Sequence, residues 1–231
     1  MSDTAVAVPE TEVRETVSEL AIPLESQAAK YADEQLFDKF VSSYLPRLQL
    51  FDSNSNACKQ NLIPIGSYGL AHNNNITSLG KELSLFILSM RYKAMDLNDG
   101  VKSFFNPHNP EFQRIKNKSE GQNTGCLCGP EFLVYIPSHD KFATFFMSSK
   151  TMRREAPNVK ELRGKPCYLR TRYIEQKPYS WWGPVATPCT TPLQAPEQSR
   201  LEEELEKFNN PPEIEVATEA EAVAAGANRE R

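Results

Sequence analysis

The chain has 231 residues, of which 39% are hydrophobic, and it carries a formal net charge of −4. This length accommodates one large domain or one medium domain with tails. Five cysteines form an odd set, no signal peptide precedes them, and no apolar run is long enough to span a membrane. These features exclude a disulfide-stapled secreted domain and a membrane-spanning protein, and they predict a cytosolic protein with reduced thiols and no membrane partner.

The charge is distributed unevenly along the chain. Residues 1–40 hold nine acids against three bases, and residues 197–231 hold ten acids against four bases. Residues 141–180 hold ten Lys or Arg against three Glu, which leaves a net charge of +7 in that window. A strongly basic centre thus lies between two acidic ends, and the overall charge hides it.

The N-terminal part predicts an arm followed by a helix. Residues 1–30 are acidic, rich in Ala, Val, Ser and Thr, and without sustained periodicity, which predicts a disordered acidic arm. Within residues 33–44, apolar side chains recur at helical spacing before Pro46, which predicts a short amphipathic helix docked on the domain. These side chains are Leu36, Phe37, Phe40, Val41 and Tyr44.

The next part predicts strands separated by turns. Residues 47–52 alternate like a strand, 53–61 form a polar loop, and 62–70 read as a strand broken by Pro64 and Gly66. Turn residues follow at 73–75 and at Gly80. Residues 82–95 are the most apolar run of the chain. Because turn residues bound it on both sides, we expect a long buried strand with apolar side chains on both faces.

Residues 98–129 have the composition of a long loop with a positive surface. Phe104 and Phe105 in it could stack on bases, or they could anchor the loop to the core. Residues 132–137 and 141–149 predict a hairpin around 138–140, and 151–164 predict a basic connector with a short helix interrupted by Pro157.

Residues 167–176 are the clearest half-exposed strand. Period-two alternation puts Tyr168, Arg170 and Arg172 on one face, together with Ile174, and Cys167, Leu169, Thr171 and Tyr173 on the other. Tyr179, Trp181 and Trp182 follow before a predicted turn at 183–192. A tyrosine and two arginines in a row on one side of a sheet suit a surface that contacts nucleic acid.

Residues 196–208 predict a short helix, and residues 209–231 predict a disordered acidic tail. The sequence divides into an arm (1–30), a globular domain (31–208) and the tail. Many short strands, few helices and no βαβ rhythm predict a mainly β (α+β) fold. We expect a small antiparallel barrel or sandwich, with an OB-like barrel as one form, decorated by short helices.

Motifs for catalysis are absent from the sequence. Neither a Walker phosphate loop nor a G-x-G-x-x-G motif is present, and the three histidines fall in separate turns. Cys126 and Cys128 are separated by one residue, whereas paired zinc ligands leave two to four, so buried or loop thiols are the alternative to a zinc half-site. We therefore predict no catalytic residues, no metal site, no cofactor and no enzymatic activity.

Five segments carry a resemblance to a known family: GPEFLVYIP, FATFFMSSKTMRREAPN, LRGK, YSWWGPVATPCTTP and EKFNNP. Together they resemble a family of tailed-bacteriophage proteins that is grouped with DNA metabolism. The resemblance covers roughly residues 60–212, with 142–158 its most specific part, and brings no established binding residues. It implies a phage origin and a location in the cytoplasm of the infected bacterium.

The layout of a β-rich basic body and an acidic C-terminal tail is similar to viral single-stranded DNA-binding proteins, although this chain ends Ala-Asn-Arg-Glu-Arg rather than in an apolar tip. We expect a phage single-stranded DNA-binding protein acting in DNA replication or recombination through a basic, aromatic-lined groove. The acidic tail would compete for that groove and recruit replication or recombination proteins. The predicted binding residues are Lys150, Arg153, Arg154, Lys165, Tyr168, Arg170, Arg172, Tyr179, Trp181 and Trp182.

Two alternatives stay open. In the first, the protein is a virion-associated or host-directed interaction protein whose basic centre pairs only with its own acidic ends. In the second, the bound nucleic acid is duplex DNA or RNA.

Overall fold

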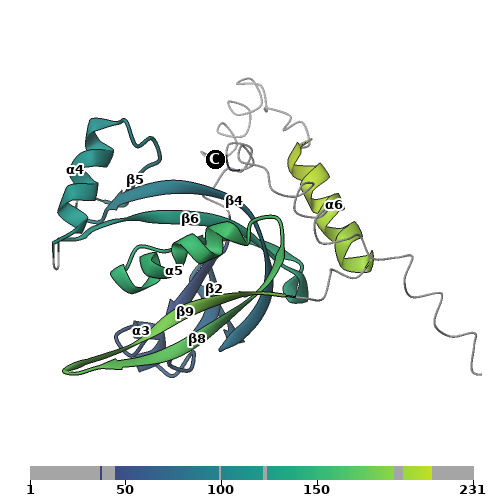
Figure 1. Cartoon of the computed structure of the whole chain (residues 1–231), viewed down its shortest axis with the longest axis horizontal. Helices are drawn as coiled ribbons and strands as arrows, with labels where there is room; N and C mark the ends of the chain where they lie inside the picture. The colour runs from purple at the N-terminus through teal and green to yellow at the C-terminus, as the bar shows by residue number, and fades with distance from the viewer. Residues whose placement is uncertain (1–36, 38–44, 99, 122–123, 190–194, 210–231) are drawn as a thin grey trace, which may run out of the picture.

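The computed structural model describes Phe37 and residues 45–98, 100–121, 124–189 and 195–209 (Figure 1). The predicted acidic arm, most of the predicted helix over residues 33–44, and the acidic tail apart from Asn209 lie outside the described residues. The strands are β1 (Arg47–Phe51), β2 (Ser67–His72), β3 (Asn75–Gly80), β4 (Glu82–Asp96), β5 (Lys102–Phe104), β6 (Cys126–Ile136), β7 (Lys141–Phe146), β8 (Pro166–Gln176) and β9 (Tyr179–Pro188). The helical segments are α3 (Asn56–Lys59), α4 (Pro110–Ser119), η2 (Pro137–His139), α5 (Lys150–Glu161) and α6 (Ala195–Asn209).

All nine strands belong to one sheet, in the order β3-β2-β1-β7-β6-β4-β8-β9, with β5 paired to β4. Neighbours run antiparallel except β1 and β7, which are parallel. The prediction of a mainly β, α+β chain is confirmed. The prediction of a small antiparallel barrel or sandwich is wrong, because the strands form one mixed sheet whose end strands, β3 and β9, are not paired with each other.

The long strand β4 is the centre of the sheet. It pairs with β6 along one side, and with β8 and then β5 along the other. Leu83, Leu85 and Ile87 point to one face and Phe86 and Leu88 to the other, and all five are buried. The prediction of a long strand is therefore confirmed, and residues 85–89 are buried on both faces. Helices cover both faces, which explains why an apolar run is needed here.

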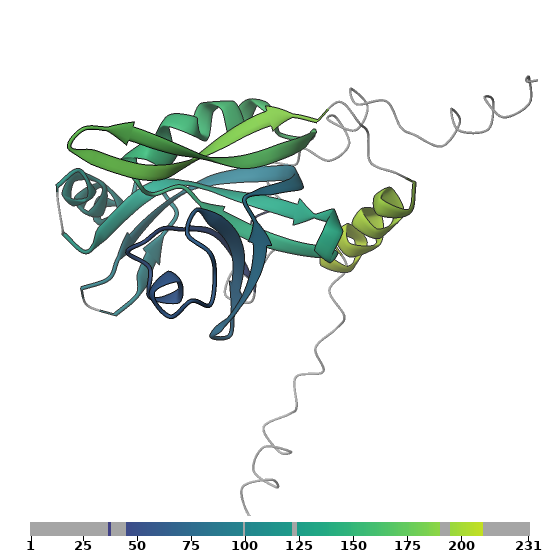
Figure 2. The same cartoon turned by 90° about the horizontal axis from the view of Figure 1, so that it is seen from below.

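The sheet is curved, and its concave face carries the larger core. Leu83, Leu85 and Ile87 pack there with Phe132 and Val134 of β6, and α5 covers them with its own apolar side chains. The phenolic oxygen of Tyr68 in β2 donates a hydrogen bond to the carbonyl oxygen of Arg170 in β8, at 3.0 Å. Strands that are far apart in the sheet order thus face each other across this core (Figure 2).

The opposite, convex face is covered by α6. Leu201 of α6 is fully buried against Phe86, Leu88 and Tyr135, and Phe37 belongs to the same cluster. Figure 1 shows α6 standing apart from α5, on the far side of β4 and β6. The predicted helix over residues 196–208 is confirmed by α6.

The predicted loop over residues 98–129 is wrong in large part, because it contains β5, α4 and the start of β6. Asn109 caps α4 through a hydrogen bond from the backbone N–H of Glu111, and Pro110 occupies the first turn. Phe112 and Ile115 bury the apolar side of α4 against β4 and β6.

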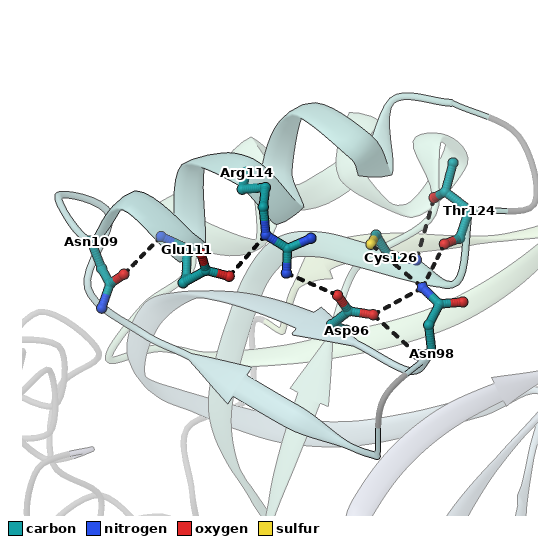
Figure 3. Close-up of polar contacts among 7 residues, drawn as sticks. All are labelled: Asp96, Asn98, Asn109, Glu111, Arg114, Thr124 and Cys126. Carbon is teal, nitrogen blue, oxygen red and sulfur yellow. Dashed lines mark hydrogen bonds and ion pairs between the residues drawn. The ribbon is translucent and has the colours of Figure 1, made fainter.

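A polar network fastens α4 to the end of β4 (Figure 3). The Asp96 carboxylate accepts hydrogen bonds from the backbone N–H of Asn98 at 3.0 Å and from Arg114 of α4 at 3.1 Å. The side-chain amide of Asn98 also donates to the carbonyl oxygen of Thr124 at 2.8 Å. These contacts hold the pKa of Asp96 below its usual value, first through the Asn98 backbone N–H. The network fixes α4 relative to the sheet.

Three further differences from the sequence prediction concern proline-containing segments. The strand predicted over 62–70 begins only at Ser67, because 62–66 fold as turns. The α5 helix continues through Pro157 without interruption. The predicted turn at 183–192 is wrong over residues 183–188, since β9 continues to Pro188 as an edge strand that tolerates proline, and residues 190–192 lie outside the described residues. Among the described helices, none has both the length and the apolar character needed to cross a membrane.

Candidate nucleic-acid interface

The β8–β9 hairpin carries most of the predicted aromatic and basic residues. Its register places Arg170 opposite Val185, Arg172 opposite Gly183, and Ile174 opposite Trp181. Residues directly opposite each other in a sheet share a face. One face of the hairpin therefore displays Tyr168, Arg170, Arg172, Tyr179 and Trp181, and we call it the hairpin face.

The members of the hairpin face differ in exposure. Tyr179 is 73% exposed at the end of the hairpin, and Arg170 and Arg172 are exposed as well. Tyr168 is half-buried, and a hydrogen bond with Cys189 raises the pKa of its hydroxyl. The face thus offers two guanidinium groups and one freely accessible ring.

Arg170 has partners on its own surface. Its Nη2 lies 3.0 Å from Oε1 of Glu82, with about half of each side chain exposed, and its guanidinium carbon lies 5.6 Å from the centre of the Tyr168 ring. Exposed ion pairs of this kind contribute about 0–1 kcal/mol to folding stability, so a phosphate can replace the Glu82 carboxylate beside Arg170 at a small cost in free energy. Arg172 lies opposite a glycine, where no side chain of β9 competes for space.

The two tryptophans point to opposite faces. Trp181 lies on the hairpin face but is half-buried, and its indole N–H finds no hydrogen-bond partner among the described residues. Trp182 points to the concave side, where its ring is 5.3 Å from that of Tyr173 and 4.4 Å from Nζ of Lys81. A Cβ on Gly66 would lie 2.5 Å from the Trp182 ring. Trp182 is thus a packing residue between the hairpin and the segment before β2.

The remaining predicted residues lie away from the hairpin face. Lys150, Arg153 and Arg154 belong to α5, which packs on the concave side, and Lys165 is exposed in the turn before β8. Nη1 of Arg153 donates to the carbonyl oxygen of Cys128 and also lies 3.2 Å from Oε1 of Glu120. The structure therefore brings five of the ten predicted residues together and separates the other five.

Sequence reasoning missed a second basic and aromatic cluster, on the convex face. Nε of Arg91 and Nζ of Lys93 donate to the buried Glu131 carboxylate at 2.8 and 2.9 Å. The Arg91 guanidinium lies between the rings of Phe37 and Phe105, at 4.2 and 3.7 Å from their centres. Arg91 and Lys93 share a face of β4 by period two, and this spacing could have been recognised in the sequence. Their partner Glu131 comes from β6, and its pairing with them could not be predicted from the local sequence.

This cluster lies beside two hollows of about 750 and 370 Å³. Both are lined by Arg47, Lys93, Glu131 and Thr144. Phe105 serves here as an anchor on Arg91 rather than as a free ring, and Phe104 packs against the apolar cluster under α4. Of the two interpretations of this phenylalanine pair, the contacts favour the anchoring one.

The two closely spaced cysteines lie in an apolar environment. Cys126 and Cys128 are buried with Ala94, Phe112 and Ile115 beneath α4. In the described part of the chain, no three His, Cys, Asp or Glu side chains are grouped closely enough to hold a metal ion. The geometry fits the interpretation of these residues as buried thiols.

Comparisons with family models, with curated proteins and with solved structures find no match to this chain.

Proposed function

We propose that this protein binds single-stranded DNA, in phage replication or recombination, and that the hairpin face makes the principal contact. The single observation that supports this most is the register of β8 and β9, which aligns Tyr168, Arg170 and Arg172 with Tyr179 and Trp181 on one face. Single-strand binders combine cations that follow the backbone with rings on which bases stack, and this face has both.

The contact differs from the groove expected from the sequence. Arg170 and Arg172 lie two positions apart on one strand, roughly 7 Å, which is close to the spacing of successive phosphates in an extended single strand. The exposed Tyr179 ring offers a stacking surface at the end of the hairpin. Trp182 is not part of this contact, because its ring packs against Gly66 and Lys81.

The first test replaces both arginines in the full-length protein. Arg170→Ala with Arg172→Ala should weaken binding to fluorescently labelled oligo-dT, measured by anisotropy over a series of salt concentrations. The magnitude of the salt slope should fall by about 1.4, since each phosphate contact on a single strand contributes about 0.7. Lys59→Ala with Lys141→Ala removes the same charge from exposed positions elsewhere and serves as the matched control.

An equal loss of affinity in both double variants would show that only bulk charge matters. A second variant, Tyr179→Ala, tests stacking, because it removes a ring and no charge. It should weaken binding to a single strand by about 1–3 kcal/mol and leave the salt slope unchanged. The native protein should also bind a single strand about tenfold tighter than a duplex, because a duplex hides the faces of its bases.

The test also separates the two classes of function. If the full-length protein binds none of single-stranded DNA, duplex DNA or RNA at low salt, nucleic-acid binding is wrong. An interaction protein of the virion or of the host would then be the better hypothesis. The proposed competition of the acidic tail with DNA concerns residues 209–231, which lie outside the described residues apart from Asn209.

A further inference from the structure

A cavity of about 620 Å³ lies between α4 and α5, on the concave face of the sheet. This face is the opposite one from the hairpin face, because Met90 and Tyr92 of β4 pair with Phe132 and Pro130 on the side that carries the larger core. Pockets for small organic ligands occupy about 300–1,000 Å³, so this cavity has the size of a ligand site.

The floor of the cavity is apolar and contains one accessible ring. The floor is formed by Met90, Tyr92 and Pro130, and the accessible ring is that of Tyr92, which is 50% exposed. Phe112 of α4 adds a second aromatic side chain to one wall. A flat, apolar or aromatic group would cover this floor and remove the Tyr92 ring from water.

The walls of the cavity carry three cations. Lys116 projects from α4, and Arg153 and Lys160 project from α5. Among the described residues, no Asp or Glu lines the cavity. The Cys128 carbonyl anchors Nη1 of Arg153 at 3.2 Å, which holds this guanidinium at the cavity.

The electrostatics of the buried Cys128 thiol show that the cations converge. Burial raises the pKa of this thiol, the positive charges of Arg153 and Lys116 act in the opposite direction, and the negative charge of Glu120 makes a smaller contribution that raises it. Positive charge thus reaches the same point of the floor from both walls. Arg153 is already paired with Glu120, which lies outside the cavity lining, at 3.2 Å. A neutral ligand would leave Lys116 and Lys160 without an anionic partner in the lining, and a bare inorganic anion would leave the apolar floor in water.

We propose that the cavity between α4 and α5 binds a phosphorylated nucleoside, with its base on the Tyr92 floor and its phosphate among Lys116, Arg153 and Lys160. Gln113 also lines the cavity; its amide nitrogen donates one hydrogen bond to the Pro107 carbonyl oxygen at 2.6 Å, and its second N–H and its oxygen can contact the edge of a base. This site goes beyond the proposed function and does not depend on it, because no member of the hairpin face lines the cavity.

The phosphorylated nucleoside could be a free nucleotide or the phosphorylated end of a strand. Calorimetric titration of the full-length protein with adenosine 5′-monophosphate, adenosine and inorganic phosphate tests the chemistry. The monophosphate should bind at least about tenfold tighter than either of its parts, since only it contacts both floor and cations. Oligonucleotides with and without a 5′-phosphate then distinguish the sources: a preference for the phosphorylated end indicates a strand terminus, and no preference indicates a free nucleotide.

Two variants locate the site. Lys116→Gln and Lys160→Gln should each lower the affinity for adenosine monophosphate about fivefold to tenfold, because each removes a charged contact to phosphate. Lys118→Gln, on the same helix but outside the cavity lining, should leave it unchanged. Arg170→Ala with Arg172→Ala should also leave it unchanged, so failure of this site and failure of the hairpin face are distinguishable. Absence of binding at millimolar nucleotide, or equal binding by Lys116→Gln and the native protein, would overturn the proposal.

Discussion

Replacing Glu131 with alanine is the sharpest test of how the convex face is held together. Its side chain is 2% exposed, and it faces two cations whose side chains are 17% and 15% exposed. Nη2 of Arg91 lies 2.7 Å from Oε2 of Glu131, and Nζ of Lys93 lies 2.9 Å from Oε1. The substitution would leave both cations in a nearly buried position without their anion.

The expected cost follows from this burial. Removing one partner of a buried ion pair typically destabilises a protein by about 3–5 kcal/mol, because the remaining charge stays desolvated. For a folded body of this size, each kcal/mol lowers the melting temperature by about 2–4 °C. Glu131→Ala should therefore lower the melting temperature by roughly 6–20 °C.

Urea unfolding followed by circular dichroism measures the loss, with Glu82→Ala as the matched control. Glu82 also pairs with an arginine, but about half of each side chain is exposed, so its removal should cost no more than about 1 kcal/mol. Replacing Glu131, Arg91 and Lys93 together by apolar residues of similar volume should recover most of the lost stability. A cost for Glu131→Ala no greater than that for Glu82→Ala would refute the reasoning.

Three further predictions concern the packing of the sheet. Gly66→Ala should cost about 1–3 kcal/mol in urea unfolding, because the glycine has a φ of +78° and its Cβ would meet the Trp182 ring; an unchanged midpoint would contradict that contact. Tyr68→Phe should cost about 0.5–1.5 kcal/mol by removing the hydrogen bond from β2 to β8, and no loss in the same assay would mean that water replaces it fully. Because the pKa of Asp96 is lower in the folded protein, its carboxylate contributes fully to folding stability above the pKa of the unfolded state, near pH 4. This contribution is lost as the pH falls through the pKa of the folded state. Asp96→Asn should therefore lower the melting temperature more at pH 7 than at pH 3, and parallel curves of melting temperature against pH for variant and native protein would count against the network of Figure 3.

Local pattern was sufficient for some elements and insufficient for others. An apolar run bounded by turn residues located β4, period-two alternation located β8, and the helical spacing of Leu201 and Leu205 located α6, because each of these signals lies within the element itself. The α4 helix was missed although its start carries a readable signal, an asparagine cap followed by proline and an acid. The polar composition around it outweighed that signal.

The arrangement of the sheet depends on contacts between distant residues. The parallel pairing of β1 with β7 joins Leu48 to Phe145, and no local pattern encodes such a choice. For the candidate site, alternation correctly grouped Tyr168, Arg170 and Arg172. It could not show that Trp182 turns inward, because that depends on the register between β8 and β9.

The outer edge of β9 has one more consequence. The Ala186 backbone N–H points away from β8 and donates to Oε1 of Glu155 in α5, at 2.9 Å. Backbone donors on one side of a strand recur at every second residue, so Pro184 and Pro188 occupy the neighbouring outward positions, and neither has an N–H to offer. Three successive donors along this edge are thus removed or occupied. An unprotected edge is a template for strand addition and aggregation. Between Pro184 and Pro188, the outer edge of β9 therefore offers no free backbone donor to an added strand, so this part of the open sheet is protected against extension by a second polypeptide.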